Sequence, residues 1–246
     1  MTTLALSGLI FLTAAIYTAV GQAGASGYIA AMALFGVPAD SMKPLALSLN
    51  VLVASYGTWR LGRAGWTAWP RLWPFLAGSV PLAFLGGLTP LPNGVYRMVV
   101  GAVLVFAGWR LFQRPGTASN AAAAGGRTPP LSGAMLAGAG IGLLAGLTGI
   151  GGGIFLTPLL LFLGWAEPKQ AAGLSAPFIL VNSAAALAGN VLSLVRLPPE
   201  TPVYAAAALA GAVLGTQVAV RTLSPLALRR ILAVILLATG ARMILA

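Results

Sequence analysis

The chain has 246 residues, of which 59% are hydrophobic and 7% are charged, and its formal net charge is +11. Soluble domains carry about 25% charged residues, so this composition excludes an ordinary soluble protein and predicts an integral membrane protein. Several apolar stretches approach the roughly 20 residues of a spanning helix, and no short run alternates apolar and polar residues as a membrane β-strand would. We therefore expect an all-α polytopic membrane protein in contact with a lipid bilayer.

The positive charge comes from 14 Lys and Arg residues against three acids, Asp40, Glu167 and Glu200. Most of the cations lie between apolar segments, as expected when basic loops stay in the cytoplasm. This interpretation needs no nucleic-acid partner, and a chain so poor in acids repels an anion little along its path. The lack of His and Cys removes the commonest metal ligand and any thiolate, so neither a bound metal nor a cofactor is expected.

The apolar pattern predicts ten helical segments, five on each side of a polar stretch. They cover residues 4–20, 27–37, 44–59, 72–90, 95–112, 131–148, 152–164, 171–195, 203–220 and 229–245. The second and seventh segments are too short to span a roughly 30 Å hydrocarbon core at 1.5 Å per residue. Each follows a glycine-rich break, which predicts a pair of half-helices.

Residues 114–130 are rich in Gly, Pro, Ser and Ala, which predicts a flexible linker. The linker separates a first repeat, residues 1–113, from a second, residues 131–246, because polar and small residues recur in the same order in both. The matched positions are Arg97, Gly108 and Arg110 with Arg229, Gly240 and Arg242; Ser48 and Ser55 with Ser175 and Asn182; and Gly21, Gly24 and Gly27 with Gly146, Gly149 and Gly152. These matches predict two structural repeats.

Charge indicates how the two repeats are oriented. In the first half the basic residues fall in two loops that two crossings separate, whereas in the second half the middle loop is basic. These residues are Arg60, Arg63, Arg71, Arg110, Arg114 and Arg127 in the first half and Arg221, Arg229 and Arg230 in the second. Because basic loops mark the cytoplasmic side, the reversed bias predicts inverted repeats with an odd number of crossings each. If the short segments re-enter instead of crossing, each half has four crossings and the repeats are parallel.

The strongest functional signal is the segment Gly146-Leu-Thr-Gly-Ile-Gly-Gly-Gly-Ile-Phe-Leu-Thr-Pro158. Irregular backbone at membrane depth survives only when it is buried in protein or lines a water-filled cavity. A helix that restarts near Gly152 would point free N–H groups and a positive dipole end into the break, which suits an anion. The alternative is helix packing, for which the preceding stripe of small residues every four positions is typical.

The second break and its sequel, GLTGIGGGIFLTPLLLFLG followed by EPKQAAGLS at residues 167–175, resemble the glycine-rich signature of the TauE/SafE family of sulfite and organosulfonate exporters. The duplicated organisation and the chain length are also similar to that family. The resemblance implies a secondary transporter of sulfur oxyanions or related small anions in the cytoplasmic (inner) membrane of a bacterium. The first break, Gly21 to Gly27, departs from the signature because it lacks the run of three glycines.

Polar groups on the two breaks and on the helices that follow them are expected to surround one pocket for a small anion. The expected substrate-binding residues are Gln22, Gly24, Ser26, Ser48, Asn50, Thr148, Gly149, Gly151, Gly152, Ser175 and Asn182. In the first break, the side chains of Gln22 and Ser26 are expected to replace some of the backbone donors that the second break provides. Asn50 and Asn182 are expected at related places in the two halves. A lone Ser in a membrane helix has an alternative role, a bond to its own backbone.

No acidic residue lies in the middle of an apolar segment, so proton coupling is left to Asp40 and Glu167 or to a proton that the substrate itself carries. The favoured function is a secondary transporter that exports a small sulfur-containing anion, sulfite or an organosulfonate, by alternating access. A passive small-anion channel stays open as the alternative. An intramembrane enzyme is disfavoured, and no catalytic residue is expected, because His and Cys are absent and the three acids are dispersed.

Overall fold

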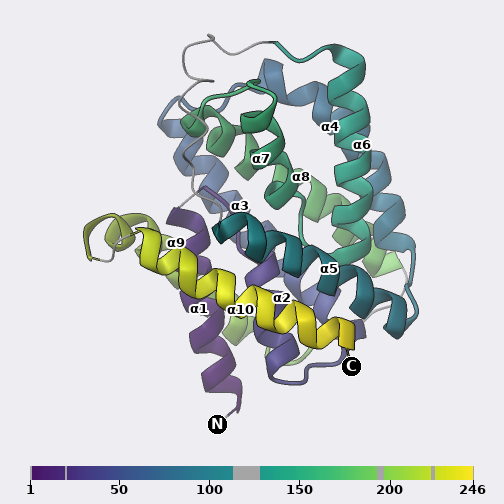
Figure 1. The fold of residues 1–246 in the computed structure, drawn as a ribbon, viewed down its shortest axis with the longest axis vertical. Helices are drawn as coiled ribbons and strands as arrows, with labels where there is room; N and C mark the ends of the chain where they lie inside the picture. The colour runs from purple at the N-terminus through teal and green to yellow at the C-terminus, as the bar shows by residue number, and fades with distance from the viewer. Residues whose placement is uncertain (1, 20, 113–127, 193–196, 223–224, 246) are drawn as a thin grey trace.

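The computed structural model describes residues 2–19, 21–112, 128–192, 197–222 and 225–245, which form α-helices and no strand (Figure 1). The helices are α1 (Thr2–Ala19), α2 (Ala25–Leu34), α3 (Ala39–Arg63), α4 (Trp69–Leu88), α5 (Asn93–Phe112), α6 (Leu131–Thr148), α7 (Gly153–Phe162), α8 (Pro168–Leu192), α9 (Thr201–Thr222) and α10 (Pro225–Leu245). Each expected apolar segment corresponds to one of them. Most of the expected linker, residues 114–130, lies outside the described residues.

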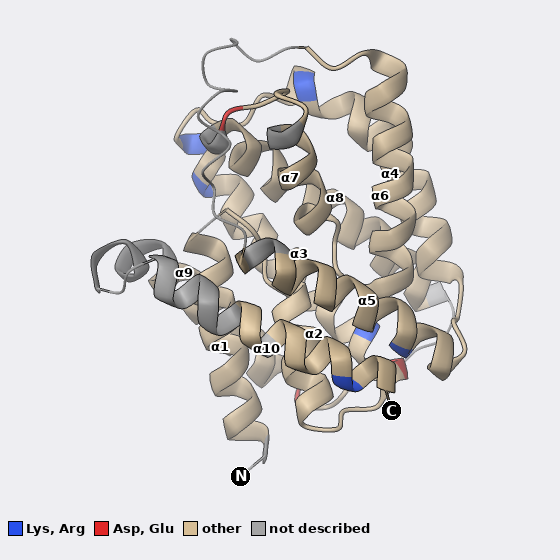
Figure 2. Cartoon of the chain, in the orientation of Figure 1, with Lys and Arg blue, Asp and Glu red and all other residues tan. Residues whose placement is uncertain are grey.

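Within the described chain, α4, α6 and residues 170–191 of α8 are long and apolar enough to cross a membrane. The helices α2 and α7 have 10 residues each, about 15 Å, and are therefore half-helices as expected. Figure 2 shows the described charged residues toward the upper and lower ends of the molecule, with an uncharged band between them. Helices whose ends meet two membrane surfaces distribute charge in this way. The prediction of an all-α polytopic membrane protein is confirmed.

The two half-helices begin after breaks whose glycines adopt the left-handed backbone region. Gly21 and Gly24 have φ of 78° and 99°, and Gly149 and Gly152 have φ of 81° and 84°. Glycine reaches this region without the steric cost that other residues meet. In each half, helix geometry therefore ends at the first glycine of the pair and restarts after the second.

The small-residue stripe of α6 packs directly on α4, and the two helices run side by side in parallel (Figure 1). A Cβ atom built on Gly138, Gly142 or Gly146 would lie 2.2 Å from a backbone carbonyl oxygen of α4. Glycine at these positions lets the two backbones approach more closely than any side chain would allow. The stripe is therefore a packing surface, and the glycines that follow it serve the break.

The helices of the two halves pack in a reciprocal pattern. The first helix of each half runs parallel to the fourth helix of the other half: α6 lies along α4, and α1 lies along α9. The third helices, α3 and α8, run antiparallel, since Asn50 bonds Ser183 and Gly57 packs on Ala176. The fifth helices, α5 and α10, are antiparallel as well. The third helices and the fifth helices of the two halves thus point in opposite directions.

The packing corrects the alignment of the two breaks. The sequence pattern aligned Gly21 and Gly24 with Gly146 and Gly149, whereas the structure places them at the positions of Gly149 and Gly152. Gly146 belongs to the straight part of α6 and contacts α4. Because glycines stand every three residues from Gly146 to Gly152, the spacing alone fits both alignments.

A pair of equivalent contacts supports the corrected alignment. Gly21 packs on Ala172 in the first turns of α8, and Gly149 packs on Lys43 in the first turns of α3. The first glycine of each break therefore lies against the long helix of the other half. In this alignment, the position of Asn50 on α3 corresponds to Ile179 on α8.

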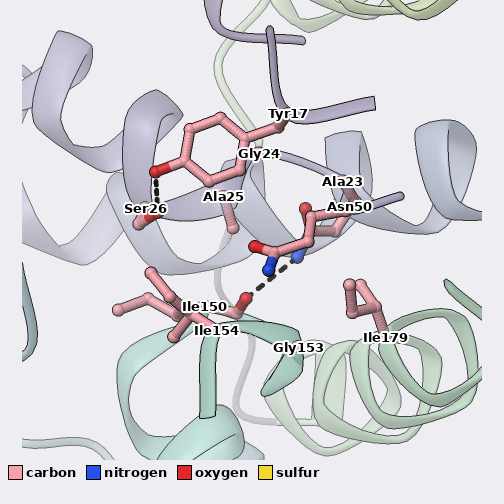
Figure 3. Close-up of a pocket in the computed structure, with 11 residues that line it drawn as sticks. Tyr17, Ala23, Gly24, Ala25, Ser26, Asn50, Ile150, Gly153, Ile154 and Ile179 are labelled. Atoms are coloured by element: carbon pink, nitrogen blue, oxygen red, sulfur yellow. Dashed lines mark hydrogen bonds between the residues drawn. The ribbon is translucent and has the colours of Figure 1, made fainter. Parts of the chain in front are cut away.

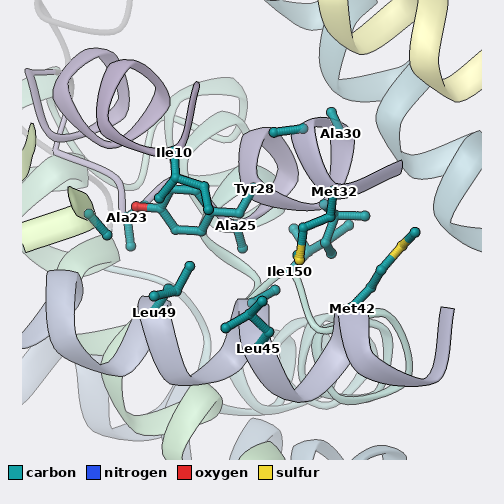
Figure 4. Packing of buried hydrophobic residues seen from close by; sticks show 14 of the residues in the cluster. Ile10, Ala23, Ala25, Tyr28, Ala30, Met32, Met42, Leu45, Leu49 and Ile150 are labelled. Carbon is teal, nitrogen blue, oxygen red and sulfur yellow. The ribbon is translucent and has the colours of Figure 1, made fainter. Parts of the chain in front are cut away.

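The broken backbone lies inside the protein. Residues 25–32 of α2 are all buried, and Leu45 and Leu49 of α3 belong with Tyr28 to the apolar cluster that Figure 4 shows. The Tyr28 hydroxyl donates a hydrogen bond to the Ala23 carbonyl and so satisfies one acceptor of the first break. This burial meets the condition under which irregular backbone is tolerated at membrane depth.

We expect Gly142→Ala to destabilise the protein by about 1–3 kcal/mol, because the added methyl would overlap the Ser79 carbonyl oxygen and push α4 and α6 apart. The melting temperature of the purified protein in detergent measures the effect. Gly140→Ala on the same helix is the matched control, since nothing lies within 4 Å of its Cβ position. Equal melting temperatures for the two variants would contradict the packing role of the stripe.

Candidate functional site

The two breaks face each other across one narrow cavity (Figure 3). Its lining comes from the end of α1, the first break, the first turn of α2, α3, the second break, the first turn of α7, and α8: Tyr17, Gln22, Ala23, Gly24, Ala25, Ser26, Asn50, Ile150, Gly153, Ile154 and Ile179. The space open to the centre of a water molecule is about 10 Å³, close to the minimum for one water. A solute larger than water would enter only if the walls separate.

Two helix N-termini meet at this cavity. Ala25 and Ser26 open α2, Gly153 and Ile154 open α7, and all four line the space. The first N–H groups of a helix have no acceptor within the helix, and they carry the positive end of its dipole. The cavity therefore receives partial positive charge from both halves of the chain, without a cationic side chain in its lining.

Asn50 connects the second break to α8. It is fully buried, and its Nδ2 donates to the Ile150 carbonyl at 3.3 Å (Figure 3). The same atom donates to the Ser183 hydroxyl at 3.3 Å. A Cβ on Gly151 would lie 2.4 Å from that Nδ2 atom, so the glycine leaves room for the amide. The Asn50 Oδ1 atom is buried and has no partner. It is a free acceptor beside the cavity.

The other polar side chains that the first half contributes to the cavity also form hydrogen bonds. The Tyr17 hydroxyl and the Ser26 hydroxyl share a hydrogen bond of 2.6 Å. Gln22 reaches Thr157 of α7 at 3.5 Å, and the Thr157 hydroxyl bonds Ser175 of α8 at 2.7 Å. These contacts connect the first break with the half-helix and the long helix of the second half.

Four of the expected site residues, Gln22, Gly24, Ser26 and Asn50, line the cavity together. Most of the others lie behind it. Thr148 at the end of α6 and Gly149, Gly151 and Gly152 of the second break are buried, and Ser175 is connected to the lining residue Gln22 through Thr157.

Two expected site residues lie outside the lining and bond their own helices. Ser48 donates to the Pro44 carbonyl, and Asn182 donates to the Phe178 carbonyl. Of the two asparagines, Asn50 lines the cavity and bonds Ser183, whereas Asn182 does not line it. The two candidate proton carriers, Asp40 and Glu167, are exposed and do not line the cavity.

The sequence did not single out Lys43, which is 6% exposed and the one charged side chain among the described residues that is buried. Its Nζ donates to the carbonyls of Gly86, Gly87 and Thr89, at 2.8, 3.1 and 3.3 Å. These carbonyls end α4, so the ammonium satisfies acceptors at the negative end of the helix dipole. Lys43 also contacts Gly149 and thus supports the second break from behind.

The apolar isoleucines of the cavity wall were also absent from the expected set. Ile150, Ile154 and Ile179 carry no polar signal that a search for ligand groups would find. The corrected alignment of the two halves does identify them, because they hold the positions of Gln22, Ser26 and Asn50.

A polytopic bundle with two broken helices whose ends meet at one internal site defines the class of membrane transporters, and this chain is of that class. The chain belongs to the family described as sulfite exporter TauE/SafE, whose sequence profile matches residues 6–243. It is also 41% identical over 234 residues, 95% of each chain, to a protein of Sinorhizobium fredii named "Probable membrane transporter protein y4hK". No solved structure matches it. The descriptions of the family and of this relative are those of a membrane transporter, not of an enzyme.

We expect Lys43→Met to destabilise the protein by about 1–3 kcal/mol, because the carbonyls at the end of α4 would lose their buried donor. Thermal unfolding in detergent measures this loss. Arg63→Met removes a cation from the exposed end of the same helix, beside Trp59, and should cost less than about 1 kcal/mol. A Lys43→Met protein that melts with the wild type would show that this ammonium is dispensable.

Proposed function

We propose that the protein is a secondary transporter that exports a small sulfur-containing anion across the cytoplasmic membrane of a bacterium. The observation that carries this proposal is the convergence of the α2 and α7 N-termini on one cavity. Backbone N–H groups at helix starts bind anions without a cationic side chain. Membership of the TauE/SafE family supports the sulfur chemistry of the substrate.

The arrangement of the two halves supports alternating access. Equivalent helices, such as α3 and α8, run antiparallel, as expected for repeats of inverted topology. The contact of Gly21 with Ala172 has its counterpart in the contact of Gly149 with Lys43. We propose that these contacts lie on opposite sides of the substrate and open in alternation.

The size of the cavity favours a transporter over a channel. A space of about 10 Å³ admits one water at most, so an anion cannot pass without movement of the walls. A passive channel would need a continuous path that stays open during conduction. We therefore place the channel second and use exchange kinetics to distinguish the two functions.

Proteoliposomes loaded with unlabelled sulfite or ethanesulfonate should show accelerated uptake of the same labelled anion, because a transporter exchanges substrate across the membrane. A pore shows no such stimulation by internal substrate, and that result would favour the channel. Asn50→Leu should lower the exchange rate at least about tenfold, equivalent to about 1.4 kcal/mol, since it removes the amide that holds the second break. Ser55→Ala is the matched control, because that hydroxyl bonds the carbonyl of Val51 in its own helix.

For proton coupling, the proposed carriers are Asp40 and Glu167. Both are exposed, so they can exchange protons with water, while their distance from the cavity lining predicts little effect on substrate affinity. In the double variant Asp40→Asn, Glu167→Gln we expect loss of uptake driven by a pH gradient, with the half-saturating concentration in exchange unchanged. Uptake that still responds fully to the gradient would remove both carboxylates from the mechanism.

A further inference from the structure

The two walls of the cavity differ in polarity although they occupy equivalent positions. Gln22, Ser26 and Asn50 of the first half correspond to three isoleucines of the second half, Ile150, Ile154 and Ile179, and all six line the cavity. The pair Ala25 and Gly153 keeps a small residue at the start of each half-helix. Both halves thus present backbone N–H donors to the cavity, whereas at these three positions only the first half presents polar side chains.

This difference follows from the alignment that the contacts of the breaks define. Gly21 against Ala172 and Gly149 against Lys43 are equivalent contacts, so α3 and α8 are in register through their first turns. Two turns further along, Asn50 and Ile179 face the same space from opposite helices. Figure 3 shows both side chains at the cavity, and a Cβ built on Gly151 would lie 2.4 Å from Nδ2 of Asn50 and 3.0 Å from Cγ2 of Ile179.

We infer that Ile154 and Ile179 determine substrate specificity. They favour an organic anion that carries a short alkyl group over an inorganic oxyanion. The inference rests on the proposed function and names the chemistry of the same site. An inorganic oxyanion presents oxygens in every direction, and those that face isoleucine would lose water without gaining a donor. An alkylsulfonate can place its oxygens at the helix N-termini and the polar wall, with its carbons against the isoleucines.

Sulfite and ethanesulfonate are suitable probes, because both present three oxygens on sulfur and only the second adds an apolar group. In proteoliposomes, each unlabelled anion competes with labelled ethanesulfonate in exchange. We expect ethanesulfonate to inhibit at a concentration at least about tenfold lower than sulfite, since one or two methylene groups in an apolar pocket discriminate by that factor. Equal inhibition, or stronger inhibition by sulfite, would overturn the inference.

Ile179→Asn gives the second half the amide that the first half has at Asn50. The preference for ethanesulfonate over sulfite should fall at least about fivefold in this variant, because oxygens on that side gain a donor. Ile179→Leu keeps the wall apolar at constant volume and should retain the wild-type ratio. If Ile179→Asn does not fold, Ile154→Ser provides a second test of specificity, because it places in the second half the residue that the first half has at Ser26.

The outcomes separate this inference from the proposed function. If the wild type exchanges neither anion, the proposed sulfur-anion transport fails. If it exchanges both but without preference, transport stands and the specificity role of the isoleucines fails. Folded Ile179→Asn and Ile154→Ser proteins with an unchanged ratio would likewise exclude the isoleucines as determinants of specificity.

Discussion

The structure depends on how two interruptions of the backbone are satisfied inside an apolar protein. Each break exposes N–H and C=O groups that hydrocarbon cannot solvate, so every one needs a partner or a polar cavity. Tyr28 bonds the Ala23 carbonyl in the first break, and Asn50 bonds the Ile150 carbonyl in the second. Tyr96 bonds the Thr148 carbonyl just before it. The N–H groups at the starts of α2 and α7 are left for the cavity between them.

This constraint explains why the two halves share a skeleton and differ in side chains. The left-handed glycines must recur, because only glycine takes that backbone freely, and they do so at equivalent positions. The side chains around these glycines can differ between the halves as long as the backbone carbonyls of each break have hydrogen-bond donors. The first half uses Tyr17, Ser26 and Asn50, whereas the second half presents isoleucines to the same space. The asymmetry of the walls is therefore compatible with a duplicated frame.

Much of this architecture was predictable from sequence because its signals are local. Apolar length, the glycine breaks and the short segments after them identify the ten helices and the half-helices among them. The alignment of the halves was not predictable, since glycines every three residues from Gly146 to Gly152 fit two registers equally well. Only the contact of Gly149 with Lys43, and of Gly21 with Ala172, selects between them. The apolar wall depends on that register, so it was missed as well.

Lys43 illustrates a physical limit of reading charge from sequence. As a cation early in a helix, between apolar residues, it has no local signal that distinguishes a surface side chain from a buried one. Its three carbonyl partners lie at the C-terminal end of α4 and just beyond it, more than 40 residues away. Residue type alone would suggest a substrate ligand, whereas the contacts assign it to the end of a helix.

The position of Lys43 also bears on how the proposed anion would leave the site. Two opposite charges at 4 Å attract by about 4 kcal/mol even at an effective dielectric of 20, so an ammonium in the cavity would hold an anion strongly. Lys43 lies two helical turns from Asn50, about 10 Å along α3, and its donors are occupied by carbonyls. Recognition of the proposed anion would be left to helix dipoles and neutral side chains, whose hold on an anion is weaker. A site of this kind binds an anion without a fixed countercharge, which is the balance that a protein needs when it must also release its substrate.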